Sequence, residues 1–202
     1  MYVLTDDMYE HLRYDGWEFT AIAPQVPALR NRTLTVNGVS KAYAMTGWRI
    51  GYAGGPKELI AAMATIQSQS TSNPCSIAQA AAQAALDGPM DFLEPRNETF
   101  RQRRDLCLDA FNATPGLSCR RPEGAFYLFP SCTGLIGRKA PNGSVLVNDT
   151  EICRYLLEEA RVAVVPGSAF GLEGYFRISF TTSTERLEQA CERIRQACGR
   201  LN

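Results

Sequence analysis

Short apolar runs and longer amphipathic stretches alternate in the first half of the chain. Three β-prone runs, bounded by glycine or proline, predict strands at residues 2–5, 34–36 and 49–53. Two helical patterns follow them, one from Pro56 to about residue 67 and an alanine-rich one over residues 76–86. The pattern therefore predicts an α/β first half in which the three strands are inner strands.

A long amphipathic stretch from residue 91 to about residue 111 opens the second half and is expected to bridge two domains. We set the domain boundary before it, which divides the chain into residues 1–90 and 91–202. The pattern places charged residues on the solvent side of the stretch and apolar residues on its inner side: Arg101, Arg103, Arg104 and Asp105 against Phe100, Leu106, Leu108 and Phe111.

The rest of the chain mixes strands and helices, which is typical of an α+β domain. Strands are expected at residues 126–129, 162–165 and 176–180, and a helix at residues 151–160. A last helix starts at a predicted capping box over residues 182–185. Apolar residues then recur at helical spacing as far as Cys198.

Composition narrows the classes of partner. With 202 residues, 45% of them hydrophobic, the chain can fill a globular core. Its 21 basic and 21 acidic residues balance without long blocks of one sign, which argues against nucleic acid or a membrane surface and favours small molecules.

Cysteine usage and hydropathy bear on metals and on the compartment. Seven cysteines without a CxxC pair, together with the single His11, argue against a metal site and a disulfide framework. No apolar run reaches the roughly 20 residues of a membrane-spanning helix, and we see no secretion signal. We therefore expect a reducing, cytoplasmic location.

Lys41 stands in a glycine-punctuated run, residues 37–52, and is one of three lysines beside eighteen arginines. A lysine amine becomes a nucleophile toward carbonyl compounds when burial and a nearby cation favour loss of its proton. Arg49, in a predicted strand, is such a cation, and its guanidinium fork suits a phosphate dianion. The pair predicts a pyridoxal phosphate lysine. Alternatively, Lys41 is a surface lysine and Arg49 forms an internal salt bridge.

Two acids, Asp6 and Asp7, follow the first predicted strand, where open α/β sheets place groups that contact ligands. One carboxylate there can keep a pyridine nitrogen protonated, which makes the cofactor an electron sink. Tyr9 can donate a hydrogen bond to the 3′ oxygen of the same ring. An acidic strand end can also be a helix N-cap, so this reading has an alternative.

Arg177 lies between Phe176 and Ile178 in a predicted strand and calls for an anionic partner, because buried charges are almost always paired. A substrate carboxylate would serve, and so would an internal ion pair. Glycines at 124 and within residues 167–171 predict loops, where the backbone either passes close to another group or simply turns.

Taken together, these segments resemble the class I pyridoxal phosphate-dependent aminotransferases of the aspartate aminotransferase kind, which have fold type I. The resemblance covers nearly the whole chain and rests on six segments in order: residues 6–12, 37–52, 72–74, 122–127, 167–171 and 176–179. It implies that residues 1–90 are the carboxy-terminal portion of the cofactor-binding large domain, with a partial, parallel-rich sheet. Residues 91–202 would form the small α+β carboxy-terminal domain.

The resemblance also implies a role for each candidate residue. Lys41 would hold pyridoxal 5′-phosphate and shuttle the substrate proton as acid and base. Arg49 would bind the cofactor phosphate, Asp6 the pyridine nitrogen and Tyr9 the 3′ oxygen. Arg177 would bind the α-carboxylate of the substrate. In the intact family, a homodimer acts on an amino acid and a 2-oxo acid.

Three features depart from the pattern of the family. Gly38 stands where many members have a serine that contacts the phosphate. Ser68 stands where some aspartate-specific members have an arginine. The family's chain is about twice as long, so this chain resembles its carboxy-terminal half and would leave an apolar sheet edge unpaired.

Three functions are compatible with these residues. The first is transamination between an amino acid, with an aspartate-like one favoured, and a 2-oxo acid. The second is a non-catalytic truncated remnant that keeps the lysine but cannot hold the cofactor, and that acts, if at all, as an oligomerisation or decoy subunit. The third is a lyase or decarboxylase on the same scaffold, because Lys41, Asp6 and Arg177 serve those reactions too and fold alone does not fix the reaction.

Overall fold

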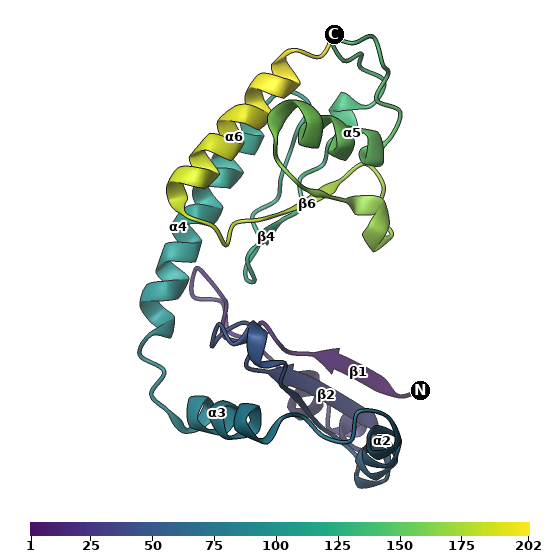
Figure 1. Ribbon diagram of the computed structural model, residues 1–202, viewed down its shortest axis with the longest axis vertical. Coiled ribbons are helices and arrows are strands. Elements are labelled where there is room, and N and C mark those ends of the chain that lie inside the picture. The colour runs from purple at the N-terminus through teal and green to yellow at the C-terminus, as the bar shows by residue number, and fades with distance from the viewer. The chain divides into compact units, whose positions relative to one another are not determined.

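The computed structural model describes residues 1–202, which form two compact units (Figure 1). The first unit spans Met1–Pro95 and the second spans Arg96–Asn202. Both units mix helices and strands, as the predicted α/β class requires. One helix, α4 (Leu93–Asn112), contains the division between them, and the boundary predicted at residue 90 lies just before this helix.

A three-stranded sheet in the order β1-β2-β3 organises the first unit. β1 (Val3–Asp6) runs parallel to β2 (Thr33–Gly38). β3 (Gly51–Gly54) runs antiparallel to β2. One of the two pairings is therefore parallel, which fits part of a larger α/β sheet.

Helical turns and two longer helices complete the first unit. The turns are α1 (Ile22–Gln25), η1 (Pro27–Arg32) and η2 (Thr46–Trp48). α2 (Lys57–Ser70) follows its N-cap Pro56, and α3 (Ser76–Asp87) ends at its C-cap Gly88. Both helices lie close to their predicted bounds, because proline and glycine are strong local signals for helix ends.

The core of the first unit joins α3 to the segment between β2 and β3. Val39 and Ile50, at the two ends of this segment, pack against Ala78 and Ala82 of α3. All four side chains are buried. The segment that carries Lys41 is therefore held at both ends by the packed core.

β1 and β3 are edge strands of this sheet, which contradicts the expectation that all three strands are inner strands. In β1, Leu4 is 67% exposed, and Tyr2 beside it is 74% exposed, whereas Leu34 of β2 is buried. An apolar run identifies a strand, but it does not show whether a neighbour covers that strand. The apolar runs therefore predicted the strands but not their surroundings, whereas the apolar sheet edge expected from the family's greater length is present at β1.

The second unit contains two long helices and several short ones. Its helical elements are the larger part of α4, η3 (Thr133–Leu135), α5 (Asp149–Tyr155), the π-helical turn η4 (Leu156–Ala160), η5 (Gly167–Phe170) and α6 (Thr184–Gly199). α4 and α6 lie side by side in Figure 1, and Arg103 Nε donates to Thr184 Oγ1 over 3.3 Å. None of the helices in the chain is both long and apolar enough to cross a membrane.

A small antiparallel sheet in the order β4-β6-β5 lies in the second unit. Its strands are β4 (Tyr127–Leu128), β5 (Val165–Pro166) and β6 (Phe176–Ser179). Phe176 and Ile178 of β6 are buried. Successive side chains in a strand point to opposite faces, so Arg177 lies on the other face of β6.

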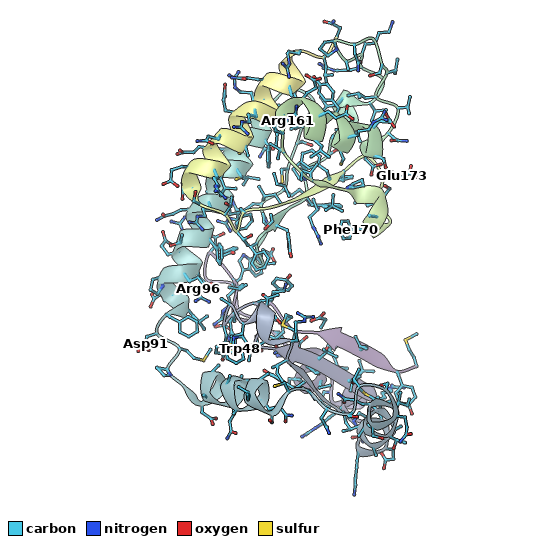
Figure 2. All side chains as sticks on the ribbon, viewed as in Figure 1. Trp48, Asp91, Arg96, Arg161, Phe170 and Glu173 are labelled. Atoms are coloured by element: carbon cyan, nitrogen blue, oxygen red, sulfur yellow. The ribbon has the colours of Figure 1, made fainter.

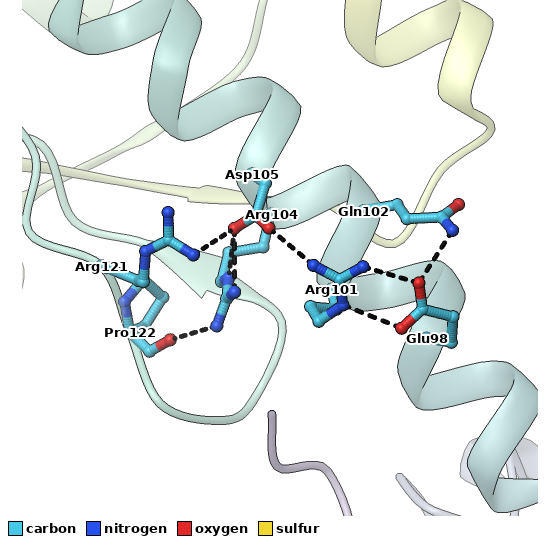
Figure 3. A network of polar contacts seen from close by, with 7 residues as sticks. All are labelled: Glu98, Arg101, Gln102, Arg104, Asp105, Arg121 and Pro122. Carbon is cyan, nitrogen blue, oxygen red and sulfur yellow. Dashed lines mark hydrogen bonds and ion pairs between the residues drawn. The ribbon is translucent and has the colours of Figure 1, made fainter. Parts of the chain in front are cut away.

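Arg104 is fully buried in α4, which contradicts its predicted place on the solvent side. Its Nε donates to Asp105 Oδ1 over 2.9 Å, and its Nη1 donates to the backbone oxygen of Pro122 over 3.0 Å (Figure 3). Arg101 and Arg121 also contact the carboxylate of Asp105, each at 3.1 Å. A buried guanidinium is tolerated here because it is paired and hydrogen-bonded.

Candidate active site

Three segments that carry predicted site residues meet at one end of the first unit's sheet. β1 and β2 are parallel, so Asp6 and Gly38, their last residues, lie toward the same end. Gly38 pairs with Gly51, the first residue of antiparallel β3. Lys41 follows β2 and Arg49 precedes β3, so both belong to this end of the sheet, which we call the site end.

The two acids at the site end have different surroundings. Asp7 is buried, and its backbone N–H donates to the oxygen of Val36 over 2.9 Å. Burial raises the pKa of the Asp7 carboxyl, and the negative charges of Glu10 and Asp6 add to this effect. Asp6 is exposed, and its Oδ1 accepts the backbone N–H of Met8 over 3.2 Å. Of the two acids, Asp6 is therefore the one that a ligand can reach.

The amine of Lys41 lies over the ring of Tyr9, with 5.9 Å between Nζ and the ring centre. This contact joins the segment after β1 to the segment after β2. The backbone near Lys41 is folded tightly, because Ala44 N donates to Lys41 O over 3.1 Å and Met45 N donates to Val39 O over 3.2 Å. The lysine thus has a defined position beside a phenol.

Arg49 is exposed and precedes β3, which corrects its predicted place inside a strand. It is the C-cap of η2 and has left-handed backbone angles, with φ 54° and ψ 47°. Its Nη1 donates to the backbone oxygen of Thr46 over 2.9 Å. The partner is a carbonyl and not a carboxylate, so the internal salt bridge considered as an alternative does not form. The guanidinium remains accessible to an anion.

Sequence reasoning misses Asn37 and Glu10, which link two segments of the site end. Asn37 Nδ2 donates to Glu10 Oε1 over 2.8 Å, and Asn37 Oδ1 accepts the backbone N–H of Gly38 over 2.7 Å. The position of Asn37 inside the run 37–52 is the one signal that could have drawn attention to it. Glu10 lies 27 residues away in the sequence, so no local spacing reveals the pair.

Gly38 is a packing requirement at the site end. A Cβ atom at this position would lie 2.9 Å from Met8 Cε and 3.1 Å from the backbone oxygen of Ile50. The second distance involves backbone, which has little freedom to move. The glycine therefore lets β2 approach both neighbouring segments, and a larger side chain here would require a small shift of its neighbours.

Arg177 belongs to the second unit, whereas the other four predicted residues belong to the first. Its Cζ lies 4.5 Å from the ring centre of Tyr127 and 4.5 Å from that of Phe170. The partners of the guanidinium in its own unit are thus aromatic rings. The internal ion pair considered as an alternative is not its mode of stabilisation.

The residues of the site end fit pyridoxal 5′-phosphate by their chemistry. Asp6 offers an accessible carboxylate for a pyridinium nitrogen, and Arg49 offers an exposed guanidinium for a phosphate. Tyr9 offers a phenol for the ring oxygen, next to the primary amine of Lys41. Each functional group of the cofactor has a counterpart on one of three adjoining segments.

Comparison with known proteins gives a family and close relatives. Residues 1–194 match the family described as Aminotransferase class I and II. An aspartate aminotransferase of Rhizobium meliloti (strain 1021) is 61% identical over 202 residues, which are 100% of this chain and 49% of that protein. An aspartate/prephenate aminotransferase of Cereibacter sphaeroides is 55% identical over 193 residues, which are 96% of this chain and 48% of that protein.

A solved structure shows the same likeness. The crystal structure of the aspartate aminotransferase from Rhizobium meliloti, at 61% identity, has a TM-score of 0.96 and covers 100% of this chain and 50% of its own. This likeness confirms the predicted fold class. The chain spans about half the length of the curated relatives that it matches.

Proposed function

Because the chain belongs to the class I and II aminotransferase family, whose members are enzymes, we propose that it serves the transfer of an amino group between an amino acid and a 2-oxo acid. Aspartate or a similar acidic amino acid is the favoured donor, because the relatives are named for aspartate or for aspartate and prephenate. The domain roles follow the same scheme. Residues 1–90 contribute to the cofactor-binding domain and residues 91–202 form the small domain.

Each site residue has one task in this proposal. Pyridoxal 5′-phosphate, when bound, supplies an electron sink for negative charge at the Cα atom of the substrate. Lys41 holds the cofactor and moves the proton at Cα. Asp6 binds the pyridine nitrogen, Tyr9 donates to the 3′ oxygen and Arg49 binds the phosphate. Arg177 binds the substrate carboxylate through its fork of N–H donors.

The contact between Lys41 and Tyr9 at the site end is the observation that carries the proposal. It places a primary amine beside a phenol, at the end of the sheet where Asp6 and Arg49 also lie. A lysine that only solvates the surface does not require a phenol, a carboxylate and a guanidinium nearby. The exposed Arg49 and the exposed Asp6 support the same conclusion, because both can still accept a ligand.

Location and assembly follow from the same family assignment. We propose a cytoplasmic enzyme that works as a homodimer, with amino acid and 2-oxo acid substrates as its partners. Because positive and negative charges balance, we do not propose nucleic acid or a membrane surface as a partner.

The proposal is tested by titrating the purified chain with pyridoxal 5′-phosphate and following the absorbance band of lysine-bound cofactor. The band should form in the wild-type chain and in Lys57→Ala, a matched lysine variant outside the site end. Lys41→Ala should abolish it. Aspartate should then discharge the band and 2-oxoglutarate should restore it, because transamination is reversible.

The outcomes separate the three candidate functions. A band that returns without any 2-oxo acid, with release of ammonia or carbon dioxide from the amino acid, supports a lyase or decarboxylase, because those reactions leave no amino group on the cofactor. A wild-type chain that forms no band supports a non-catalytic remnant. A band that survives in Lys41→Ala contradicts the assignment of the lysine.

A further inference from the structure

Arg177 is held by two aromatic rings that come from opposite sides of β6. β6 is the central strand of its sheet, with β4 on one side and β5 on the other. Tyr127 belongs to β4, and Phe170 belongs to η5, which directly follows β5 (Figure 2 labels Phe170). The guanidinium lies over both rings, with Cζ 4.5 Å from each ring centre.

Strand register explains why Tyr127 reaches the arginine. Tyr127 pairs with Ser179 in the antiparallel register, and Arg177 lies two residues before Ser179 on the same face of β6. Tyr127 and Arg177 are therefore diagonal neighbours across the two strands, at a separation that an aromatic ring can bridge. Phe176 and Ile178 point to the buried face, so they cannot take this role.

Stacking of this kind restricts how an anion can approach. An aromatic ring attracts a guanidinium to its face, so two rings leave the edge of the planar group, with its N–H donors, as the open direction. An anion that approaches along that edge can form two parallel hydrogen bonds, which is the geometry of a carboxylate. The rings also remove rotational freedom that the long side chain would otherwise lose on binding.

Both rings are themselves fixed by neighbours. Phe170 is 48% exposed, yet its ring meets that of Phe129 edge-on with 6.0 Å between centres, and Phe129 stacks on Tyr175 at 5.4 Å. Tyr127 follows a loop that the buried Arg104 holds through its hydrogen bond to the Pro122 oxygen (Figure 3). The two rings therefore form a preset clamp.

We propose that Tyr127 and Phe170 are positioning residues, which hold the Arg177 guanidinium so that it binds a substrate carboxylate edge-on. This inference rests on the proposed function of Arg177 and adds the two residues that determine the affinity of its guanidinium for the carboxylate. Loss of one ring should raise the Kd for the carboxylate by about 2- to 30-fold, which corresponds to one cation–π contact.

The test is modification of arginine in the intact 202-residue chain by butane-2,3-dione, with and without succinate as the carboxylate probe. Peptide mapping by mass spectrometry gives the labelling rate at Arg177, and the succinate dependence of that rate gives the Kd. Exposed Arg193 serves as the internal control in every sample. The variants are Phe170→Leu, Tyr127→Leu and the ring-preserving Phe170→Tyr and Tyr127→Phe.

Succinate should protect Arg177 in the wild-type chain and in both ring-preserving variants, and the two leucine variants should bind it more weakly. Protection is the ratio of the labelling rates of Arg177 with and without succinate, measured within each variant. A general loosening of the fold would also change the labelling rate of Arg193, so the two effects can be distinguished. Equal Kd values in all five chains would overturn the positioning role and leave the function of Arg177 intact. Absence of protection in the wild-type chain would overturn the function of Arg177 itself, and the inference with it.

Discussion

Adjacent acids at the end of β1 differ in what they can do. Asp6 is exposed and Asp7 is buried, although both follow the same apolar run. The sequence places an acid at the strand end, and the structure decides which of the two a ligand can reach. The choice depends on strand parity, because successive side chains leave the chain on opposite sides.

Replacing Asp7 with Asn should stabilise the first unit at pH 7 and have little effect near pH 3. Burial raises the pKa of Asp7 in the folded chain above its unfolded value of about 3.9. The folded state therefore binds more protons in the interval above that value, and stability falls as the pH rises through it. Asn keeps the shape of the side chain without the charge.

Urea unfolding followed by tryptophan fluorescence measures this effect, because Trp17 and Trp48 both belong to the first unit. Exposed Asp87→Asn is the matched control and should show no such pH dependence. If Asp7→Asn changes the free energy of unfolding equally at both pH values, the pKa of this carboxyl is not raised in the folded chain.

Replacing Arg49 with Ala should weaken binding of pyridoxal 5′-phosphate by about 10- to 100-fold, the worth of one or more hydrogen bonds to a charged group. The side chain is exposed and contacts a backbone oxygen, so the fold should tolerate the change. Spectroscopic titration gives the Kd, with exposed Arg32→Ala as the control. Unchanged affinity in Arg49→Ala would contradict the proposal that Arg49 binds the cofactor phosphate.

Element ends in the second unit follow local chemistry closely. α6 begins after Ser183, whose Oγ accepts the backbone N–H of Arg186 over 3.4 Å. The capping box predicted over residues 182–185 is thus displaced by one residue, with Ser183 as the cap. Leu187, Cys191, Ile194 and Cys198 are buried, as their helical spacing predicts.

Ser183→Ala should destabilise α6 by about 1 kcal/mol, because it removes the side-chain acceptor for an otherwise unpaired N–H. Amide hydrogen exchange over residues 184–199 measures the loss locally. Thr182→Ala, one residue earlier, should leave the exchange of the helix nearly unchanged. A larger effect at Thr182 than at Ser183 would contradict the assignment of Ser183 as the N-cap and would support Thr182 instead.

Local sequence signals predicted most helices and strands. Features that depend on contacts between residues distant in the sequence were not predicted. Proline and glycine marked the ends of α2 and α3 because their backbone constraints act within a turn. Arg104 was misplaced because its partner Pro122 comes from a distant loop. The run 162–165 gave a strand that forms only at its end, in β5, because pairing with β6 decides which residues extend.

The candidate site divides in the same way. The types of residue at positions 6, 9, 41, 49 and 177 carry the chemistry, and the sequence is enough to select them. Their surroundings depend on contacts between segments, such as Asn37 with Glu10 and Arg177 with its two rings. The spacing of residues along the chain does not predict these contacts.

The whole chain leaves apolar groups at the surface of its first unit. β1 is an edge strand with exposed Leu4, and α2 contains no buried residue, with Ile66 71% exposed. An unpaired, apolar strand edge favours association with other chains. The relatives are about twice as long, so more chain is available to them for covering such surfaces.

The isolated chain should therefore self-associate, and Leu4→Lys should reduce this, because a charged side chain on an edge strand opposes pairing. Sedimentation velocity over a range of concentrations measures the association. Thr5→Lys, which faces the other side of the strand, is the matched control for added charge. A monomeric wild-type chain at high concentration would contradict the prediction.

Borohydride trapping tests the central assignment most directly. The chain, alone or completed by the amino-terminal half of a relative, is loaded with pyridoxal 5′-phosphate, reduced with borohydride and mapped by mass spectrometry. We predict that the pyridoxyl group is attached to Lys41. Attachment to Lys57 or Lys139, the other two lysines of the chain, would contradict the assignment.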